Sequence, residues 1–272
     1  LLPVRTAWFR TRTERHGDLG SVLARLADPQ AQARYSVGWI DCLATGASLG
    51  RTVLMLGDHA GVEDLPHRER RRPLVPKARR ARSVPVDFPG WALNRWSVAA
   101  FNQCYWWSQG PGGRLVDYDR WFYPLDAMHG WNRIYGKRGF VQYQALFADA
   151  QAEAGLRRLL ERIAAAGAAS FLAVIKRCGP ANPSPLSFLH EGVTLALDLP
   201  NTGAALRDLV RDLDRIVLDH GGRLYLAKDT LMDAATFAAM YPRRDDFLRV
   251  KARVDPAGRF VSDQARRVGL CP

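Results

Sequence analysis

The segment FVQYQALF at residues 140–147 opens the part of the chain whose pattern decides the fold. Apolar residues at helical spacing follow it, and Gly167 is placed to end that helix. Two apolar strand-like segments come next, at residues 171–176 and 193–199, and a second amphipathic helix leads to the last such segment, at residues 223–227. This order, β-α-β-β-α-β, predicts a ferredoxin-like unit.

The segments on either side complete the predicted architecture. In front of the unit the pattern indicates a strand, a helix and two more strands, a partial copy of the same arrangement, at residues 4–12, 18–27, 35–42 and 52–56. Behind it, residues 231–240 and 244–253 have the pattern of helices. We therefore expect an α+β fold, with a largely antiparallel sheet, helices on one face and a C-terminal helical segment.

Composition excludes several classes of protein. With 47% hydrophobic residues the chain can bury a real core, and it has no apolar run of eighteen residues that could span a bilayer. The N-terminus has the alternating polarity of a strand and no signal-peptide pattern, so a cytoplasmic protein, or one peripheral to the membrane, is expected. The chain begins at Leu1 and not at Met, which suggests the C-terminal part of something longer.

Metal and disulfide chemistry are not expected. The four cysteines lie far apart without a Cys-x-x-Cys pair, and the six histidines are equally dispersed. This spacing favours isolated thiols in a reducing compartment and predicts no metal site.

A net charge of +12 favours anionic partners, and much of it lies in the proline-punctuated stretch from His67 to Pro85. We expect an exposed loop there, with attraction to anionic lipid headgroups as the functional alternative. The aromatic residues at 91–107 are expected to mark core and interface. They are not expected to stack on bases, because the cations lie mostly elsewhere, and no nucleic-acid partner is predicted.

Candidate chemistry lies at strand ends, since no phosphate loop or nucleophile elbow is present. Gln142 and Gln144 project from the same face of one strand, where two carboxamides suit a polyhydroxylated ligand better than a dry core. Lys176 and Lys228 each follow an apolar strand, where a cation can meet a phosphate or act as an acid or base; each taken alone also fits a surface lysine. The aromatic stretch at 121–144 suits a pocket wall or an ordinary core.

Several long segments, in order, resemble the C-terminal part of the decaprenylphosphoryl-β-D-ribose 2′-oxidases, FAD-dependent enzymes of the vanillyl-alcohol-oxidase-like superfamily. These segments are YSVGWID, FYPLDAMHGWNRIYGKRGFVQYQ, FLAVIKRCGPANPSPLSF and GGRLYLAKD…MYPRRDDFLRVKARVDPAGRFVSD. The resemblance implies an exit strand of a flavin domain at residues 1–12, a substrate domain at 13–222 and a segment returning to the flavin domain at 223–272. The FAD-binding half itself is absent from this sequence.

The resemblance also implies roles for individual residues. Lys228 matches the family's active-site lysine, and Tyr225 lies just before it near the flavin. The matches to residues of the substrate pocket are Gln142, Gln144, Lys176, Trp39, Phe122, Leu125, Trp131 and Thr194. Phe122 stands where a Tyr is usual, Thr194 and Ala196 replace an Asn and a Cys, and Ala173 replaces another Asn, which puts the exact substrate in doubt.

The activity implied is oxidation of a secondary alcohol of a sugar, the expected substrate being polyprenyl-phosphate-linked ribose on a 2′-epimerisation route to a cell-wall arabinan precursor. FAD is the implied cofactor, and an NAD(P)H-dependent reductase is the implied partner. Two alternatives stay open: another sugar or aldonolactone oxidase of the superfamily, and a non-catalytic binding module or partner of a separate flavin-binding half.

Overall fold

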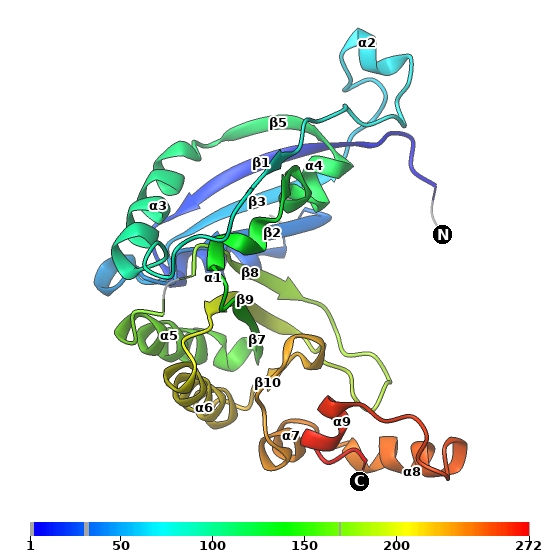
Figure 1. The fold of residues 1–272 in the computed structure, drawn as a ribbon. Coiled ribbons are helices and arrows are strands. Elements are labelled where there is room, and N and C mark those ends of the chain that lie inside the picture. Colours follow the sequence, from blue (N-terminus) through cyan, green and yellow to red (C-terminus); the bar gives the residue numbers. More distant parts are fainter. Residues whose placement is uncertain (1–2, 30–32, 169, 272) are drawn as a thin grey trace.

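A computed structural model describes residues 3–29, 33–168 and 170–271. One eight-stranded antiparallel sheet runs through it, in the order β10-β7-β9-β8-β2-β3-β1-β5 (Figure 1). The α+β class expected from the sequence is confirmed. The strands of this sheet are β1 (Trp8–His16), β2 (Tyr35–Ile40), β3 (Thr52–His59), β5 (Gly112–Asp117), β7 (Phe140–Ala148), β8 (Ala173–Cys178), β9 (Gly192–Pro200) and β10 (Arg223–Leu224).

The helices connect these strands and form the C-terminal end of the chain. They are α1 (Leu19–Ala27), α2 (His67–Arg70), α3 (Arg95–Ser108), α4 (Tyr118–Phe122), α5 (Asp149–Ala165), α6 (Ala204–Asp219), α7 (Ala234–Met240), α8 (Arg244–Val254) and α9 (Asp263–Arg267). Two short strands, β4 (Arg82–Ser83) and β6 (Met128–His129), pair in parallel. They join the connection between β3 and α3 to the connection between α4 and β7.

The second half of the chain forms the predicted ferredoxin-like unit. Its elements follow as β7-α5-β8-β9-α6-β10, and its strands lie in the order β10-β7-β9-β8. The first half has the same strand order, β5-β1-β3-β2, once β5 is included, but it stays a partial copy because its second helix, α3, lies on the other face of the sheet. The two halves meet where β2 pairs with β8.

Helices α1, α5 and α6 pack on one face of the sheet and enclose the main core. Helix α3 departs from the expected arrangement, because its aromatic rings contact the opposite face. Its Tyr105 ring lies 4.6 Å from the Trp39 ring, and the Arg15 guanidinium lies 5.8 Å from the Trp106 ring. Trp39 and Arg15 share that opposite face, since both stand across from Val53 in their strand pairs.

Residues 91–107 were expected to mark core and interface, and the core part of that expectation fails for three tryptophans, one before α3 and two on it. Trp91, Trp96 and Trp107 do not join the core, and their exposed fractions are 77%, 79% and 68%. The helix is held instead through polar contacts, with Asn102 Nδ2 donating to Asp41 Oδ1 at 2.7 Å and Arg51 Nη1 donating to Gln103 Oε1 at 2.9 Å. The side of α3 that faces the sheet thus carries buried Asn102, and Trp96 and Trp107 remain on the exposed side.

The strand predicted at 223–227 is shorter than the sequence suggests. Only Arg223 and Leu224 pair with β7, and Tyr225 N donates the last sheet hydrogen bond, to Gln144 O at 2.9 Å. A 3-10 turn at Leu226–Lys228 then bends the chain over β7. At the other end, residues 8–12, assigned by resemblance to an exit strand of a flavin domain, pair within this sheet with β3 and β5.

The junction between the halves requires a residue without a side chain at position 38. A Cβ there would lie 2.6 Å from Ile175 Cγ2 and 2.7 Å from Thr52 Cγ2, and Ile175 and Thr52 are fully buried. Gly38→Ala is therefore expected to lower the free energy of unfolding by about 1–3 kcal/mol, as overpacking of a dense core does. The midpoint of urea denaturation measures the change.

Gly17→Ala is the matched control, because a Cβ at Gly17 has no neighbouring atom within 4 Å. Its midpoint should stay within about 0.5 kcal/mol of the wild-type value. Equal effects of the two substitutions would contradict a tightly packed junction.

Candidate functional site

The sheet face turned away from α5 and α6 carries polar side chains on three neighbouring strands. Side chains alternate along a strand, and the register places Gln142 opposite Asp198 and Lys176 opposite Thr194. The odd-numbered neighbours Tyr143, Ala145 and Phe147 point into the core on the other face. We call the set Gln142, Gln144, Lys176, Thr194 and Asp198 the polar sheet face.

Hydrogen bonds hold both carboxamides in place. Gln142 Nε2 donates to Asp198 Oδ1 at 3.0 Å, and Gln144 Nε2 donates to Thr194 Oγ1 at 3.1 Å. The Thr194 hydroxyl in turn donates to Ala145 O at 2.7 Å. Thr194 and Asp198 are buried, whereas the two carboxamides are half-buried and remain accessible.

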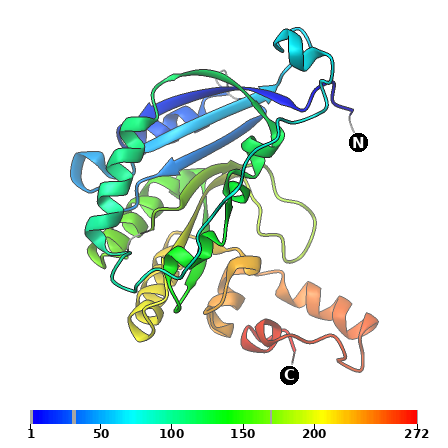
Figure 2. The ribbon, with the colours of Figure 1, turned by 45° about the horizontal axis from the view of Figure 1, so that its top comes forward.

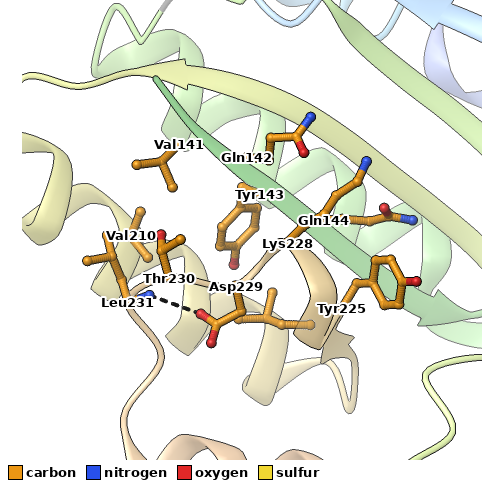
Figure 3. A pocket seen from close by; sticks show the side chains of 11 residues that line it. Val141, Gln142, Tyr143, Gln144, Val210, Tyr225, Lys228, Asp229, Thr230 and Leu231 are labelled. Carbon is orange, nitrogen blue, oxygen red and sulfur yellow. Dashed lines mark hydrogen bonds between the residues drawn. The ribbon is translucent and has the colours of Figure 1, made fainter. Parts of the chain in front are cut away.

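Lys228 completes the group from a different part of the chain. The 3-10 turn after β10 carries it over β7, beside a cavity that Gln142, Gln144 and Tyr225 also line (Figure 3). The remaining lining residues are Val141, Tyr143, Val210, Leu224, Asp229, Thr230 and Leu231. The sequence-predicted residues Gln142, Gln144, Tyr225 and Lys228 thus meet around one cavity.

The electrostatics of the site favour an anion. Within the described part of the chain neither Lys176 nor Lys228 forms an ion pair with a carboxylate. Burial lowers the pKa of Lys228; the Asp198 carboxylate opposes this shift, and the Lys176 charge adds to it. Two ammonium groups that act on each other form a natural site for a phosphate or another negatively charged group.

Asp198 and Tyr135 belong to the site, and sequence reasoning missed both. Burial raises the pKa of Asp198, while Gln142, Lys228 and Tyr135 lower it. The pKa of Tyr135 is raised by burial and by the Asp198 charge. Neither the Tyr135 hydroxyl nor Asp198 Oδ2 completes a hydrogen bond of regular geometry with a described residue. The available signal for Asp198 was its position in the same strand as Thr194, an even number of residues away, which places both side chains on the same face.

A line of aromatic rings borders the polar sheet face and contains two of the predicted pocket residues, Trp39 and Trp131. Each ring centroid lies 4.5–6.1 Å from the next. The line runs through Trp39, Tyr105, Phe101, Phe171, Tyr135, Phe140 and Trp131. Aromatic walls beside a few placed polar groups are typical of small-molecule sites.

Phe122 and Leu125 lie elsewhere, outside the lining of the cavity. The Phe122 ring packs edge-on against Phe9 at 5.4 Å and Tyr35 at 5.2 Å, on the first half of the sheet. Leu125 is in the 3-10 turn at Pro124–Ala127 that follows α4. Their assignment to the substrate pocket stays a prediction.

This arrangement has three chemical capabilities. The carboxamides can bind hydroxyl groups, the two lysines can hold an anionic group, and Lys228 gives up its proton more readily than an ordinary lysine because its pKa is lowered. Among the described residues no group of three His, Cys, Asp or Glu side chains could hold a metal ion, and no helix is long and apolar enough to cross a bilayer.

Comparison with known proteins gives relatives along the whole chain. Decaprenylphosphoryl-β-D-ribose oxidase of Mycolicibacterium smegmatis is 35% identical over 272 residues, which cover 99% of this chain and 59% of that protein. An uncharacterized Streptomyces coelicolor protein from the mprA 5′ region is 34% identical over 277 residues, which cover 99% of this chain and 75% of that protein. A family model described as D-arabinono-1,4-lactone oxidase matches residues 148–268. The chain therefore spans 59% and 75% of the lengths of the two relatives.

Among solved structures, a xylooligosaccharide oxidase from Myceliophthora thermophila in complex with xylobiose shares the fold. Its TM-score is 0.53 at 11% sequence identity, over 93% of this chain and 54% of that one.

The lowered pKa of Lys228 gives a direct test of the site. At pH 8–9 a larger fraction of Lys228 should be the neutral amine, so acetic anhydride should acetylate it faster than its accessibility alone predicts, with the exposed Lys137 as internal reference. In Asp198→Asn the supporting carboxylate is removed, the pKa of Lys228 falls further, and the midpoint of the labelling profile should move to lower pH. Peptide mass spectrometry of samples labelled at pH 6–11 measures the acetylated fraction of Lys228. An unchanged midpoint in Asp198→Asn would mean that Asp198 and Lys228 do not interact.

Proposed function

Because the chain belongs to the decaprenylphosphoryl-β-D-ribose oxidase family, whose members are FAD-dependent oxidoreductases, we propose that it is the substrate-side portion of such an enzyme. The substrate class is a sugar with a secondary alcohol, carried on a polyprenyl phosphate, with ribose as the sugar. The observation that carries this proposal is the polar sheet face beside Lys228, where two fixed carboxamides line one cavity together with Lys228 and Lys176 stands on β8 of the same face.

The residues around the opening fit a flavin on its outer side. The Tyr225 ring packs on Phe188 with centroids 4.8 Å apart and still exposes 36% of its surface beside Lys228, which suits contact with a planar cofactor. FAD, when bound, supplies the acceptor for a hydride from the carbinol carbon. Tyr225 and Lys228 would hold its ring system on the cavity side.

The chain's own residues bind and orient the sugar. Gln142 and Gln144 hold its hydroxyl groups, and Lys176 meets the phosphate. Lys228 lies near the reacting hydroxyl, where an amine with a lowered pKa can accept the hydroxyl proton or orient the group. Trp39 and Trp131, with Leu125 and Phe122 further along, form the apolar boundary of the pocket.

A second candidate is an oxidase for a soluble sugar or aldonolactone. Two observations favour it: the match of residues 148–268 to the D-arabinono-1,4-lactone oxidase model, and the small side chains at Thr194 and Ala196 on the sheet face. Profiling of lipid-linked and soluble substrates separates the two functions.

The partners follow from the same proposal. The remaining flavin-binding half belongs to the same protein or to a separate chain, and an NAD(P)H-dependent reductase completes the epimerisation. Contact with a membrane surface is proposed for the basic segment 67–82, where the exposed arginines with neither an ion pair nor a side-chain hydrogen bond within the described residues are Arg68, Arg71, Arg72, Arg80 and Arg82.

Lys228→Met should separate chemistry from cofactor binding. In the flavin-loaded protein, anaerobic reduction by decaprenylphosphoryl ribose, followed as loss of visible flavin absorbance, should slow by about 100-fold or more, since a positioned acid or base contributes about that factor. Flavin affinity should change much less. Gln151→Met on the exposed side of α5 is the control. Undiminished reduction in Lys228→Met would remove Lys228 from the mechanism.

The basic segment should bind anionic vesicles in a salt-dependent way. Arg71→Gln with Arg72→Gln should weaken binding to phosphatidylglycerol-containing vesicles, measured by sedimentation, by about thirtyfold, since each of the two cations near an anionic surface contributes about 1 kcal/mol. Arg211→Gln with Arg215→Gln on α6 removes the same charge elsewhere and should have little effect. Equal losses in the two double variants would assign the binding to net charge alone.

A further inference from the structure

The 3-10 turn that carries Lys228 is held from outside by the last helix, α9. Within the turn, Lys228 N donates to Tyr225 O at 3.0 Å. Asp229 N then donates to Leu226 O at 3.3 Å. Gln264 Nε2, on α9, donates to the same Leu226 carbonyl at 2.5 Å. The turn is therefore supported by a side chain that comes 38 positions further along the chain than the carbonyl it binds.

A second residue of α9, Arg267, holds the end of the turn. Its Nη2 forms an ion pair with Asp229 Oδ2 at 2.9 Å, and its Nη1 donates to Met232 O. The Asp229 side chain exposes only 5% of its surface, and its Oδ1 accepts from the backbone N–H groups of Leu231 and Met232 at 3.0 and 2.9 Å. Lys228 and Asp229 are neighbours whose side chains point in different directions from the turn (Figure 3). Fixing Asp229 on one side therefore fixes the backbone of Lys228 on the other.

Apolar residues hold α9 in place independently of these polar contacts. Val268 and Leu270, at the end of the helix, are buried in the main core. Residues three and four positions apart lie on the same side of a helix, which places Gln264 with Arg267 and Val268. Arg266 lies on the other side and exposes 53% of its side chain. Loss of Gln264 or Arg267 therefore leaves the apolar anchor of α9 intact.

The ionisation of Lys228 depends on where the turn holds it. Burial lowers the pKa of Lys228; the Asp198 carboxylate opposes this shift, and the Lys176 charge adds to it. If the turn moved outward, water would replace the buried surroundings of the amine. Because burial is the largest of the three causes, the pKa of Lys228 would then rise toward that of an ordinary lysine. The pKa of Lys228 thus reports the position of the turn.

We infer that Gln264 and Arg267, which we call the α9 clamp, are positioning residues for Lys228. They hold the turn after β10 and so set the place of the Lys228 ammonium group beside the cavity. The inference rests on the proposed function for the step that it serves, the acceptance of the hydroxyl proton by Lys228. The clamp itself consists of contacts within the chain, so it can be measured without substrate or cofactor.

The two residues of the α9 clamp differ in what else they do. Burial raises the pKa of Asp214 to about 7, and the charges of Asp229 and Asp233 add to this rise. The Arg267 charge opposes it. Loss of Arg267 therefore leaves the buried Asp229 carboxylate without its cation, which also lowers the stability of the fold. Gln264 is uncharged, so its substitution tests the clamp without this second effect.

The clamp is tested by labelling Lys228 with acetic anhydride at a series of pH values. Gln264→Met keeps the approximate size of the side chain and removes the donor to Leu226 O, so the turn should loosen. The midpoint of the Lys228 labelling profile should then move to higher pH, the direction opposite to that expected in Asp198→Asn. Arg267→Met should shift it in the same direction. Midpoints are compared, because greater exposure raises the labelling rate at every pH.

Three further variants serve as controls. Arg266→Met removes the same charge from the exposed side of α9, and Gln151→Met makes the neutral exchange on the exposed side of α5. Neither should move the midpoint of Lys228. Arg267→Lys keeps a cation beside Asp229, but one ammonium group replaces the two nitrogens that bind Asp229 and Met232 O. Its stability should stay near that of the wild type, and its midpoint should lie between those of the wild type and Arg267→Met.

Urea denaturation of each variant separates positioning from general stabilisation. A lower urea midpoint together with an unchanged Lys228 midpoint in Gln264→Met would overturn the inference, since α9 would then only stabilise the fold. The same conclusion would follow if Arg266→Met shifted the Lys228 midpoint as far as Gln264→Met does. If Arg267→Met does not fold, Gln264→Met and Arg267→Lys decide the question.

The consequence for the proposed reaction is measured in the flavin-loaded protein. Reduction of the flavin by decaprenylphosphoryl ribose should slow by up to about 100-fold in Gln264→Met, the loss that misplacement of a catalytic group by about 1 Å can cause. An undiminished rate would overturn the positioning role. Failure of the proposed function has a different signature, namely a shifted Lys228 midpoint in Gln264→Met while the lipid-linked sugar does not reduce even the wild-type flavin.

Discussion

The register between β7 and β9 is the constraint on which the rest of the molecule depends. It places Gln142 opposite Asp198 on one face while Tyr143, Ala145 and Phe147 enter the core on the other. A slip of one residue would put the carboxamides into the core and the aromatic rings on the ligand face. The buried helices α5 and α6 exclude that slip, so the packing of one face fixes the chemistry of the other.

The repeated strand order explains how so broad a sheet leaves one face available. Two units of the same order join where β2 pairs with β8, and α1, α5 and α6 cover a single side (Figure 2). Helix α3 lies over the other side of the first unit, held by Asn102 and Gln103. The second unit keeps its polar side beside Lys228, so two units of the same strand order have sheet faces with different surroundings.

Differences between expectation and structure occur where long-range contacts overrode a local pattern. RLYLA has a strand's alternation, but the sheet ends at Leu224, and the following turn aims Lys228 back over β7. The tryptophans at 91, 96 and 107 look like core residues, yet the inner side of α3 is taken by Val98 and Asn102. Hydrophobicity alone does not say which side of a helix has a partner.

The sequence by itself determined the α+β class, the order of the second unit and the shared face of Gln142 and Gln144, because strand and helix periodicities and the alternation of side chains are local properties. By resemblance it also supplied the family and Lys228. Only the tertiary structure brought Asp198 and Tyr135 beneath Lys228, joined Trp39 to Trp131 through one line of rings and fixed both carboxamides by hydrogen bonds to Asp198 and Thr194. These relations join residues up to about a hundred positions apart, and such distances are set by strand pairing and packing, which no local pattern encodes.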